Sequence, residues 1–466
     1  MENVITISPV TRVEGNANIF IKLDEAGNPI VANVSIPELR GFEKFMEGMD
    51  VIQTPHVTQR ICGVCPIAHF MAASKAVDMV YGVTPSETAL QLRKLLYNAH
   101  YIHSHGLHFF LMASPDFLIG DADPSERNVL GLLKKDPELA KNALKIRSAG
   151  QKIAETMTGK PIHPSYYGLG GVSRPLKKDE LETIQKDAKE ALELIRPLIP
   201  MFGTVFDKVK AEMDFEQATH HMGITNSEGT HEIYDGNIQV LKKDGTLLDI
   251  DASKYYEEIG EKTLSYSNMK APILKNMEDG VYRVGPLSRL NICKEMKTSL
   301  AQETFIQLKK DNSLLQNVLL NNYARLIELV ESIERVNEIA ADEGTILNSD
   351  VRQSKERIAN KTGIGVVEAP RGTLIHHYEV DDRGFITEAN LIVATQNNVL
   401  TMNESILTYA KNHIKDGNYD EKILNGAEMI LRSYDPCFSC STHAIKVQII
   451  DGKEKSVKTL LHKKTL

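Results

Sequence analysis

Two short cysteine motifs at opposite ends of the sequence constrain this chain more than any other feature. "RICGVCPIAHF" contains Cys62 and Cys65, followed by a histidine four residues later, and "DPCFSCSTHAI" contains Cys437 and Cys440, followed by a histidine three residues later. Two thiolates at this spacing can bind one metal from one loop, and a fold that joins both loops offers four sulfurs to one site. The sequence therefore predicts that its two ends meet in space.

The cysteine pairs alone leave structural zinc, a redox metal and no metal as open interpretations. Structural zinc usually ties pairs roughly 15–20 residues apart within one small module, whereas these pairs are far apart in a chain of 466 residues. Pro66 favours a helix start, which would put Cys65 at a helix N-terminus that stabilises a thiolate. The fifth cysteine, Cys293, is expected to be an inert buried thiol. With a single cysteine left over, the chain can hold no additional four-cysteine iron–sulfur cluster, so a redox site would pass electrons to another polypeptide.

Composition and charge narrow the class of protein. The 54 basic against 62 acidic residues give a net charge of −8, which argues against a nucleic-acid surface. No apolar run is long enough to span a membrane, and no secretory signal is visible, so we expect a cytoplasmic protein. The length predicts two or three packed subdomains.

The residue patterns predict an α+β fold that is mainly helical, with a central bundle of long helices and small β elements near both ends. Alternating apolar residues indicate strands, an Asp-Gly pair indicates a hairpin turn, and Thr84-Pro85-Ser86-Glu87 indicates a helix start. The expected strands are 3–8, 17–23 and 30–36, the expected hairpin is 238–250, and the expected helices are 84–112, 177–198 and 299–342.

The two cysteine motifs resemble the pair RxCGxCxxxH and DPCxxCxxH that marks the large, catalytic subunit of [NiFe] hydrogenases. Three further matches occur in the right order: "RVEG" at Arg12–Gly15, "RGFE" at Arg40–Glu43 and "EAPRG" at Glu368–Gly372. The resemblance extends from Arg12 to His443 and so covers nearly the whole chain. It implies the [NiFe] hydrogenase large-subunit fold.

The resemblance also implies a ligand set. Cys62 and Cys437 would be terminal thiolates on nickel, and Cys65 and Cys440 would bridge nickel and iron. The iron would also carry carbon monoxide and two cyanide ligands. No iron–sulfur cluster would belong to this chain.

Further residues acquire roles through the same resemblance. Arg371 would lie over the metals and donate to one cyanide, with Asp435 as its support. Thr395 would serve the other cyanide, and His69 would donate a hydrogen bond to a bridging sulfur. Glu14 would take the proton away from a nickel thiolate. Taken singly, Glu14 is a solvated turn residue, Arg371 an ion-pair arginine and Asp435 a turn starter.

A second ion site is implied beside the first. Glu43, the backbone carbonyl of Leu391 and His443 resemble the ligands of a magnesium or iron ion, although His443 alone would be an ordinary loop histidine. One position departs from the family pattern: in "YIHSHGLHF", Ser104 stands where many relatives carry an acid. This removes one carboxylate from the surroundings of the metals.

The resemblance divides the chain into residues 1–443, the catalytic domain, and residues 444–466, a C-terminal extension. In this interpretation a maturation endopeptidase removes the extension after His443. The alternative is an ordinary terminal β-hairpin.

The implied activity is the cleavage or formation of H₂, with electrons passed to an iron–sulfur small subunit and a further electron-transfer subunit. The chain looks most like the methanogen-type, viologen-reducing hydrogenases that are coupled to heterodisulfide reductase. Deazaflavin-reducing and NAD-reducing types are the alternatives within the family. Outside it, the alternatives are a zinc scaffold held by the four cysteines and a metal-free subunit of a proton-pumping complex, but such subunits lack the four cysteines.

Overall fold

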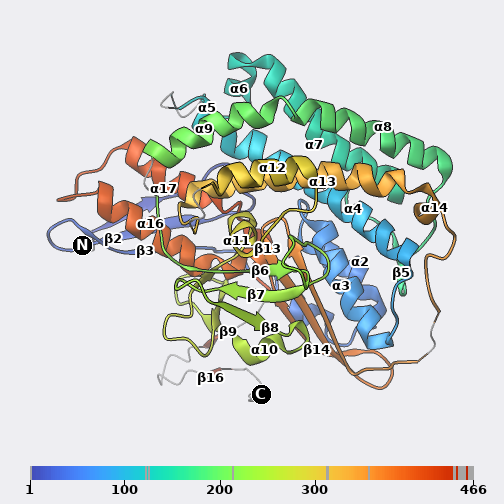
Figure 1. Cartoon of the computed structure of the whole chain (residues 1–466). Helices are drawn as coiled ribbons and strands as arrows, with labels where there is room; N and C mark the ends of the chain where they lie inside the picture. Colours follow the sequence, from blue (N-terminus) through green and yellow to red (C-terminus); the bar gives the residue numbers. More distant parts are fainter. Residues whose placement is uncertain are drawn as a thin grey trace.

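Long amphipathic helices form the centre of the molecule. The structure, a computed structural model, describes residues 3–120, 123, 126–212, 215–310, 314–354, 357–443, 448–449 and 458–459. Helix α4 (Glu87–Gly106) packs against α7 (Pro137–Thr158) and α13 (Asn321–Ala341), and α8 (Lys178–Ile195) packs against α7 and α13. Figure 1 shows these helices as a layer above the sheets. The predicted mainly helical α+β fold with a central bundle is confirmed.

The bundle helices begin and end at residues that satisfy the free backbone groups. The Ser86 hydroxyl accepts the N–H of Ala89 at the start of α4, and the Asp136 carboxylate accepts the N–H of Leu139 at the start of α7. Gly159, with φ +75°, ends α7 in the left-handed conformation. Each is a residue type that favours its position. The start of α4 was predicted from the sequence, whereas α7 was not.

Two predicted helices differ in detail. The helix expected over 84–112 is α-helical only to Gly106 and continues as a π-helical segment, Leu107–Ala113. The prediction of a single helix over 299–342 is wrong, because α12 (Ser299–Leu308) and α13 are separate helices. Between these two helices the backbone forms hydrogen bonds with a side chain. The Asn291 side chain donates to the carbonyl of Leu315 and accepts the N–H of Leu315, so neither group can form a helical hydrogen bond.

The strands form small, mostly antiparallel sheets. The predicted N-terminal strands form the sheet β1-β2-β3, and the predicted hairpin is β7-β8. A four-stranded sheet in the order β11-β6-β7-β8 places more β structure in mid-chain than the sequence suggested. The strands are β1 (Val4–Ile7), β2 (Asn18–Leu23), β3 (Pro29–Ser35), β4 (Tyr167–Gly168), β5 (Gly171–Val172), β6 (His220–Thr225), β7 (Asn237–Leu241), β8 (Leu247–Ile250), β9 (Ile259–Thr263), β10 (Lys270–Leu274), β11 (Tyr282–Arg283), β12 (Thr362–Ala369), β13 (Gly372–Val380), β14 (Ile386–Ile392), β15 (Gln448–Ile449) and β16 (Lys458–Thr459).

One helix–sheet contact brings the first cysteine motif to its place. Helix α3 (Pro66–Tyr81) lies directly on β12, and a Cβ at Gly365 would collide with the carbonyl oxygen of Ala72. Glycine is required here because the helix backbone touches the strand. The remaining helices are α1 (Phe42–Met46), α2 (Thr54–Val57), α5 (Ser114–Leu118), α6 (Val129–Lys135), α9 (Leu198–Glu212), α10 (Tyr255–Glu258), α11 (Pro286–Ile292), α14 (Glu343–Ile346), α15 (Ala394–Asn397), α16 (Val399–His413) and α17 (Glu421–Ser433).

The apolar interior consists of three clusters, in keeping with the expected subdomains. The largest joins the bundle helices to α3 and contains the four paired cysteines, the second lies between the N-terminal sheet and α16–α17, and the third lies around the mid-chain sheet. Within the described ranges, no helix combines the length and the apolarity that a membrane crossing requires.

Candidate metal centre

The two cysteine motifs meet inside the protein. Cys62 follows a 3-10 turn, Thr58–Ile61, and Cys65 is the residue before α3, with Pro66 in its first turn as predicted. Cys437 and Cys440 flank a short turn after α17. The Sγ atoms lie 3.3 Å apart for Cys62 and Cys437, 3.3 Å for Cys65 and Cys440, and 2.7 Å for Cys437 and Cys440. All four side chains are buried and converge within 4.8 Å of one another.

Backbone contacts hold the two loops in register. Phe438 N–H donates to the carbonyl of Glu14, and Gly15, with φ +79°, lies so close that a Cβ there would approach Phe438 and the Ser439 nitrogen to 3.0 Å. The Arg40 guanidinium donates to the carbonyls of Ile61 and Ser439, at 2.6 and 3.4 Å. The "RVEG" and "RGFE" motifs therefore join the two cysteine loops.

Four thiols in a dry site cannot all ionise without a cation. Burial raises the pKa of the Cys437 and Cys440 thiols well above the usual value. Burial acts on Cys62 in the same direction, but hydrogen bonds from the other three cysteines and the charge of Arg371 lower its pKa well below the usual value. The Cys62 sulfur also accepts the N–H groups of Val64 and Cys65, both at 3.2 Å. Several thiolates together require bound metal, which supplies the missing positive charge.

A small hollow lies beside the sulfurs. Its wall is mostly apolar but includes the guanidinium of Arg371, the hydroxyl of Thr395 and the ring of His69. The lining residues are Cys65, Ala68, His69, Ala369, Arg371, Leu374, Val393, Ala394, Thr395, Cys437 and Cys440. Soft sulfur ligands suit a thiolate-bound nickel or iron site as well as zinc. Arg371 and Thr395 add hydrogen-bond donors to these sulfurs, so the residues present fit a nickel or iron group that carries further ligands.

Arg371 points a free donor at this hollow. Its Nε donates to the carbonyl of Asp435 at 2.7 Å and its Nη2 to the carboxylate at 3.1 Å, while Nη1 has no partner among the described residues. Thr395 Oγ1 accepts the N–H of Cys437 at 3.0 Å, so its own proton remains available. Both side chains can therefore donate to a ligand in the hollow.

Ser104, the uncharged residue that stands where many relatives carry an acid, is buried. Its hydroxyl has no hydrogen-bond partner among the described residues. The Asp435 carboxylate faces two buried guanidiniums. One belongs to Arg371, and the other belongs to Arg325, whose Nε lies 3.8 Å from the carboxylate. Burial lowers the pKa of Arg325 to about 10, and the nearby carboxylate of Asp435 opposes this. The region beside the sulfurs is consequently rich in positive charge.

Glu14 lies where a carboxylate could exchange protons with the second cysteine loop. It is half-buried, and its carboxylate accepts hydrogen bonds from the hydroxyl and the N–H of Ser439, the residue directly before Cys440. The structure thus brings Glu14 next to the sulfur ligands, as the resemblance predicts.

The structure places Glu43 in contact with Leu391, and His443 beside Phe42, the residue before Glu43. The carboxylate of Glu43 accepts the N–H of Leu391 at 3.0 Å, and the rings of His443 and Phe42 lie 5.5 Å apart. Both ring nitrogens of His443 are buried without a partner among the described residues. Lys270, which the sequence did not single out, donates to the carboxylates of Glu43 and Glu261 at 3.3 and 3.0 Å. The unpaired imidazole fits an ion ligand, although Lys270 already supplies one positive charge to Glu43.

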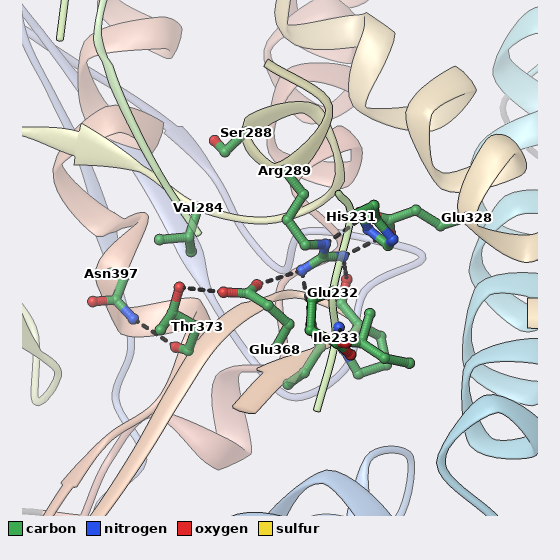
Figure 2. Close-up of polar contacts among 12 residues, drawn as sticks. His231, Glu232, Ile233, Val284, Ser288, Arg289, Glu328, Glu368, Thr373 and Asn397 are labelled. Atoms are coloured by element: carbon green, nitrogen blue, oxygen red, sulfur yellow. Dashed lines mark hydrogen bonds and ion pairs between the residues drawn. The ribbon is translucent and has the colours of Figure 1, made fainter. Parts of the chain in front are cut away.

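A buried ion network fixes the turn that presents Arg371. The Arg289 guanidinium donates to both carboxylate oxygens of Glu328 at 2.6 Å and to Glu368 at 2.7 Å. It also donates to the carbonyls of Ala369 and Pro370, both at 3.1 Å. Figure 2 shows Arg289 between the two carboxylates. All five of its N–H groups are used, so the three residues that precede Arg371 have little freedom.

The network extends from Glu328 to two histidines. Glu328 contacts His105 at 2.9 Å and His231 at 3.1 Å, and the other nitrogen of His231 contacts Glu331 at 2.5 Å. Burial lowers the pKa of His231, but the charges of Glu331 and Glu328 outweigh it and raise the pKa to about 9. His231 is therefore a buried cation that balances the excess carboxylate charge beside Arg289.

Sequence reasoning missed Arg289, Lys270 and His231, and also the buried pair His376 and Tyr378 on β13. Arg289 and His231 lie in segments without a recognisable motif. His376 follows "EAPRG" by four residues, and this spacing was the available indication.

Family comparison agrees with this geometry. The family model described as nickel-dependent hydrogenase matches residues 40–141 and 203–443, and a HoxL-like model matches residues 4–39. The chain is 39% identical to one subunit of the F420-non-reducing hydrogenase of Methanothermobacter thermautotrophicus, over 96% of both chains. It is 33% identical to the beta subunit of the NAD-reducing hydrogenase HoxS of Cupriavidus necator, again over 96% of both.

Solved structures share the fold. A crystallised NAD+-reducing [NiFe]-hydrogenase in the H₂-reduced state superposes with a TM-score of 0.90 and 35% identity, over 95% of this chain and 99% of the other. A [NiFeSe]-hydrogenase from Dm. baculatum superposes with a TM-score of 0.76 and 22% identity, over 95% of this chain and all of the other.

The His231 cation makes a testable prediction about stability. Its pKa is about 9 in the folded protein and about 6.5 in an unfolded chain. The folded state binds the proton more tightly, so this contribution, about 3 kcal/mol, is complete below pH 6.5 and is lost as the pH rises to about 9. We expect the melting temperature of wild type relative to His231→Gln to fall over this interval. His413→Gln, at an exposed histidine, is the control, and a difference that stays constant with pH would contradict the assignment.

Proposed function

This chain belongs to the nickel-dependent hydrogenases as their catalytic large subunit, and on this basis we propose that its four cysteines hold a nickel–iron centre with carbon monoxide and two cyanides on the iron. The observation that carries the proposal is the convergence of four buried sulfurs beside a hollow. Cys62 and Cys437 would bind nickel alone, and Cys65 and Cys440 would bridge both metals.

The residues around the hollow would bind the iron ligands. The unpaired Nη1 of Arg371 and the hydroxyl proton of Thr395 are the donors for the two cyanides. Asp435 holds Arg371 in place through two hydrogen bonds. His69, which lines the hollow with Cys65 and Cys440, would donate to a bridging sulfur.

When bound, the nickel–iron centre supplies the Lewis acid and the electron acceptor for heterolytic cleavage of H₂. The protein supplies the base. A cysteine thiolate would accept the proton, and Glu14 would receive it next, because its carboxylate accepts the N–H of Ser439, one of the two residues between Cys437 and Cys440. Glu14 is half-buried and so connects the interior to solvent.

The second ion, magnesium or iron, would be bound by Glu43, the Leu391 carbonyl and His443. Support comes from the two unpaired ring nitrogens of His443 and from the Glu43–Leu391 contact. The C-terminal extension is related to this site, because the family match ends at His443. Two short strands of the extension, β15 and β16, pair, and the rest of 444–466 lies outside the described residues.

The electron partners of the proposal are an iron–sulfur small subunit and an electron-transfer subunit that serves heterodisulfide reductase. The strong similarity to F420-non-reducing hydrogenase subunits supports this type. The second candidate is an NAD-reducing hydrogenase, favoured by the TM-score of 0.90. A cytoplasmic location belongs to the same proposal.

The bridging assignment predicts that Cys65→Ser and Cys440→Ser abolish H₂ oxidation, because an alcohol is a poor ligand for soft metals. Both proteins should contain little nickel and iron by elemental analysis. Cys293→Ser is the matched control, since this buried thiol lies outside the cluster. Wild-type metal content in either bridging variant would refute the assignment.

For Glu14→Gln we expect full metal content but H₂/D⁺ exchange slowed by about 10²-fold or more, because the amide cannot carry the proton. Isotope exchange followed by mass spectrometry is the measurement. Glu25→Gln, at an exposed carboxylate, should exchange like wild type. Unchanged exchange in the Glu14 variant would remove this residue from the proton path.

Purified complex should reduce viologen dyes with H₂, and reduce heterodisulfide when its reductase is added. It should not reduce the deazaflavin F420 or NAD. Rapid reduction of NAD by H₂ would instead favour the second candidate.

If the extension is removed, the intact mass of active protein should correspond to a chain that ends at His443. Protein without nickel should have the mass of the full chain. Active protein that retains residues 444–466 would contradict the cleavage.

A further inference from the structure

Three buried polar rings form a chain that leads away from the metal hollow. Nδ1 of His69 lies 3.1 Å from Nε2 of His376, and Nδ1 of His376 lies 2.7 Å from the hydroxyl of Tyr378. The exposed fractions of His69, His376 and Tyr378 are 1%, 0% and 0%. His69 lies one turn into α3 after Cys65, and the other two lie on β13, two residues apart and so on the same face.

Both imidazoles are neutral. Within the described part of the chain, neither His69 nor His376 forms a hydrogen bond or ion pair with a carboxylate, and a second proton on either ring would be buried without a counter-charge. Burial lowers the pKa of His376 well below its usual value, and the neighbouring His69 and His443 add to this. A neutral imidazole has one N–H and one bare nitrogen, so each ring must donate on one side and accept on the other.

This rule couples the three groups. If Tyr378 donates to Nδ1 of His376, then Nε2–H of His376 donates to Nδ1 of His69, and the proton of His69 is placed on Nε2. If the order is reversed, Nε2 of His69 is bare and the phenol must donate elsewhere. The neighbouring Thr54 hydroxyl, which donates to the carbonyl of Val51 at 2.8 Å, is the group that could accept it.

The sulfurs favour one of these two directions of hydrogen bonding. His69 lines the hollow together with Cys65 and Cys440, and with Nδ1 bonded to His376, Nε2 is the ring nitrogen that remains for the hollow. A bare nitrogen facing thiolate sulfur is repulsive, whereas an N–H facing it is attractive. The direction from Tyr378 towards the sulfurs is therefore the stable one.

We propose that His376 and Tyr378 are positioning residues that fix the proton of His69 on Nε2, so that His69 donates to a bridging thiolate. The inference rests on the proposed nickel–iron centre and extends it by two residues that never touch the metals. A hydrogen bond to a thiolate lowers the electron density that the sulfur gives to the metals and raises their reduction potential. Tyr378 thus tunes the centre from a distance.

The experiment is infrared spectroscopy of the iron-bound carbon monoxide in purified complex, together with the midpoint potential of nickel. Tyr378→Phe removes the phenol O–H, and Tyr166→Phe is the matched control, because Tyr166 is also buried but its hydroxyl has no partner among the described residues. We expect Tyr378→Phe to move the carbon monoxide band to lower wavenumber and to lower the potential. His69→Ala should produce a larger shift of both in the same direction, and Tyr166→Phe none.

A rescue pair covers the case in which Tyr378→Phe does not fold. His376→Leu should shift the band as His69→Ala does, whereas His376→Gln, whose amide can donate to Nδ1 of His69, should restore it most of the way. A shift in His69→Ala without any shift in Tyr378→Phe or His376→Leu would overturn the relay and leave the proposed His69 contact intact. If His69→Ala shifts neither the carbon monoxide band nor the potential, both the relay and the proposed contact of His69 with a bridging sulfur are wrong.

Discussion

The charge balance of four buried sulfurs is the constraint on which the rest of the structure depends. Sulfurs within 4.8 Å of one another in an apolar interior are stable as thiolates only beside compensating positive charge. Part of that charge is built into the protein as the guanidinium of Arg371, and the remainder must come with the metals. The fold around the site can be understood as the means of keeping these charges at fixed distances.

The position of Arg371 depends on a second group of charged side chains, which do not contact the sulfurs. Arg289 donates to the turn before Arg371 and to Glu328, and the His231 cation lies between Glu328 and Glu331. Such buried ions are costly to desolvate, so the gain from pairs such as His231 with Glu331 is largely offset by the cost of burying the charges. Their benefit is geometric, because the turn from Glu368 to Pro370 is held by bonds at every residue.

Much of this organisation could be predicted from the sequence, and the limits have physical causes. The cysteine motifs, Glu14, Arg371 and Asp435 sit in short patterns whose order alone indicates a joint site, and the structure brings them together. Arg289 and His231 could not be found this way, because a buried ion pair depends on which helices pack together. The break between α12 and α13 was not predicted, also because it depends on tertiary contacts. The Asn291 side chain, 24 residues before Leu315, forms hydrogen bonds with the Leu315 N–H and carbonyl that a continuous helix would have used.

Arg40 has a consequence for how the centre is assembled. Its guanidinium holds the carbonyls of Ile61 and Ser439 at once, and its own N–H and that of Gly41 donate to the carbonyl of Thr442. The side chain of Arg40 thus joins the first and second cysteine loops, and the backbone of Arg40 and Gly41 holds the approach to His443. Displacement of any one of the three weakens the contacts of the other two, so the two cysteine loops and the approach to His443 form one cooperative unit.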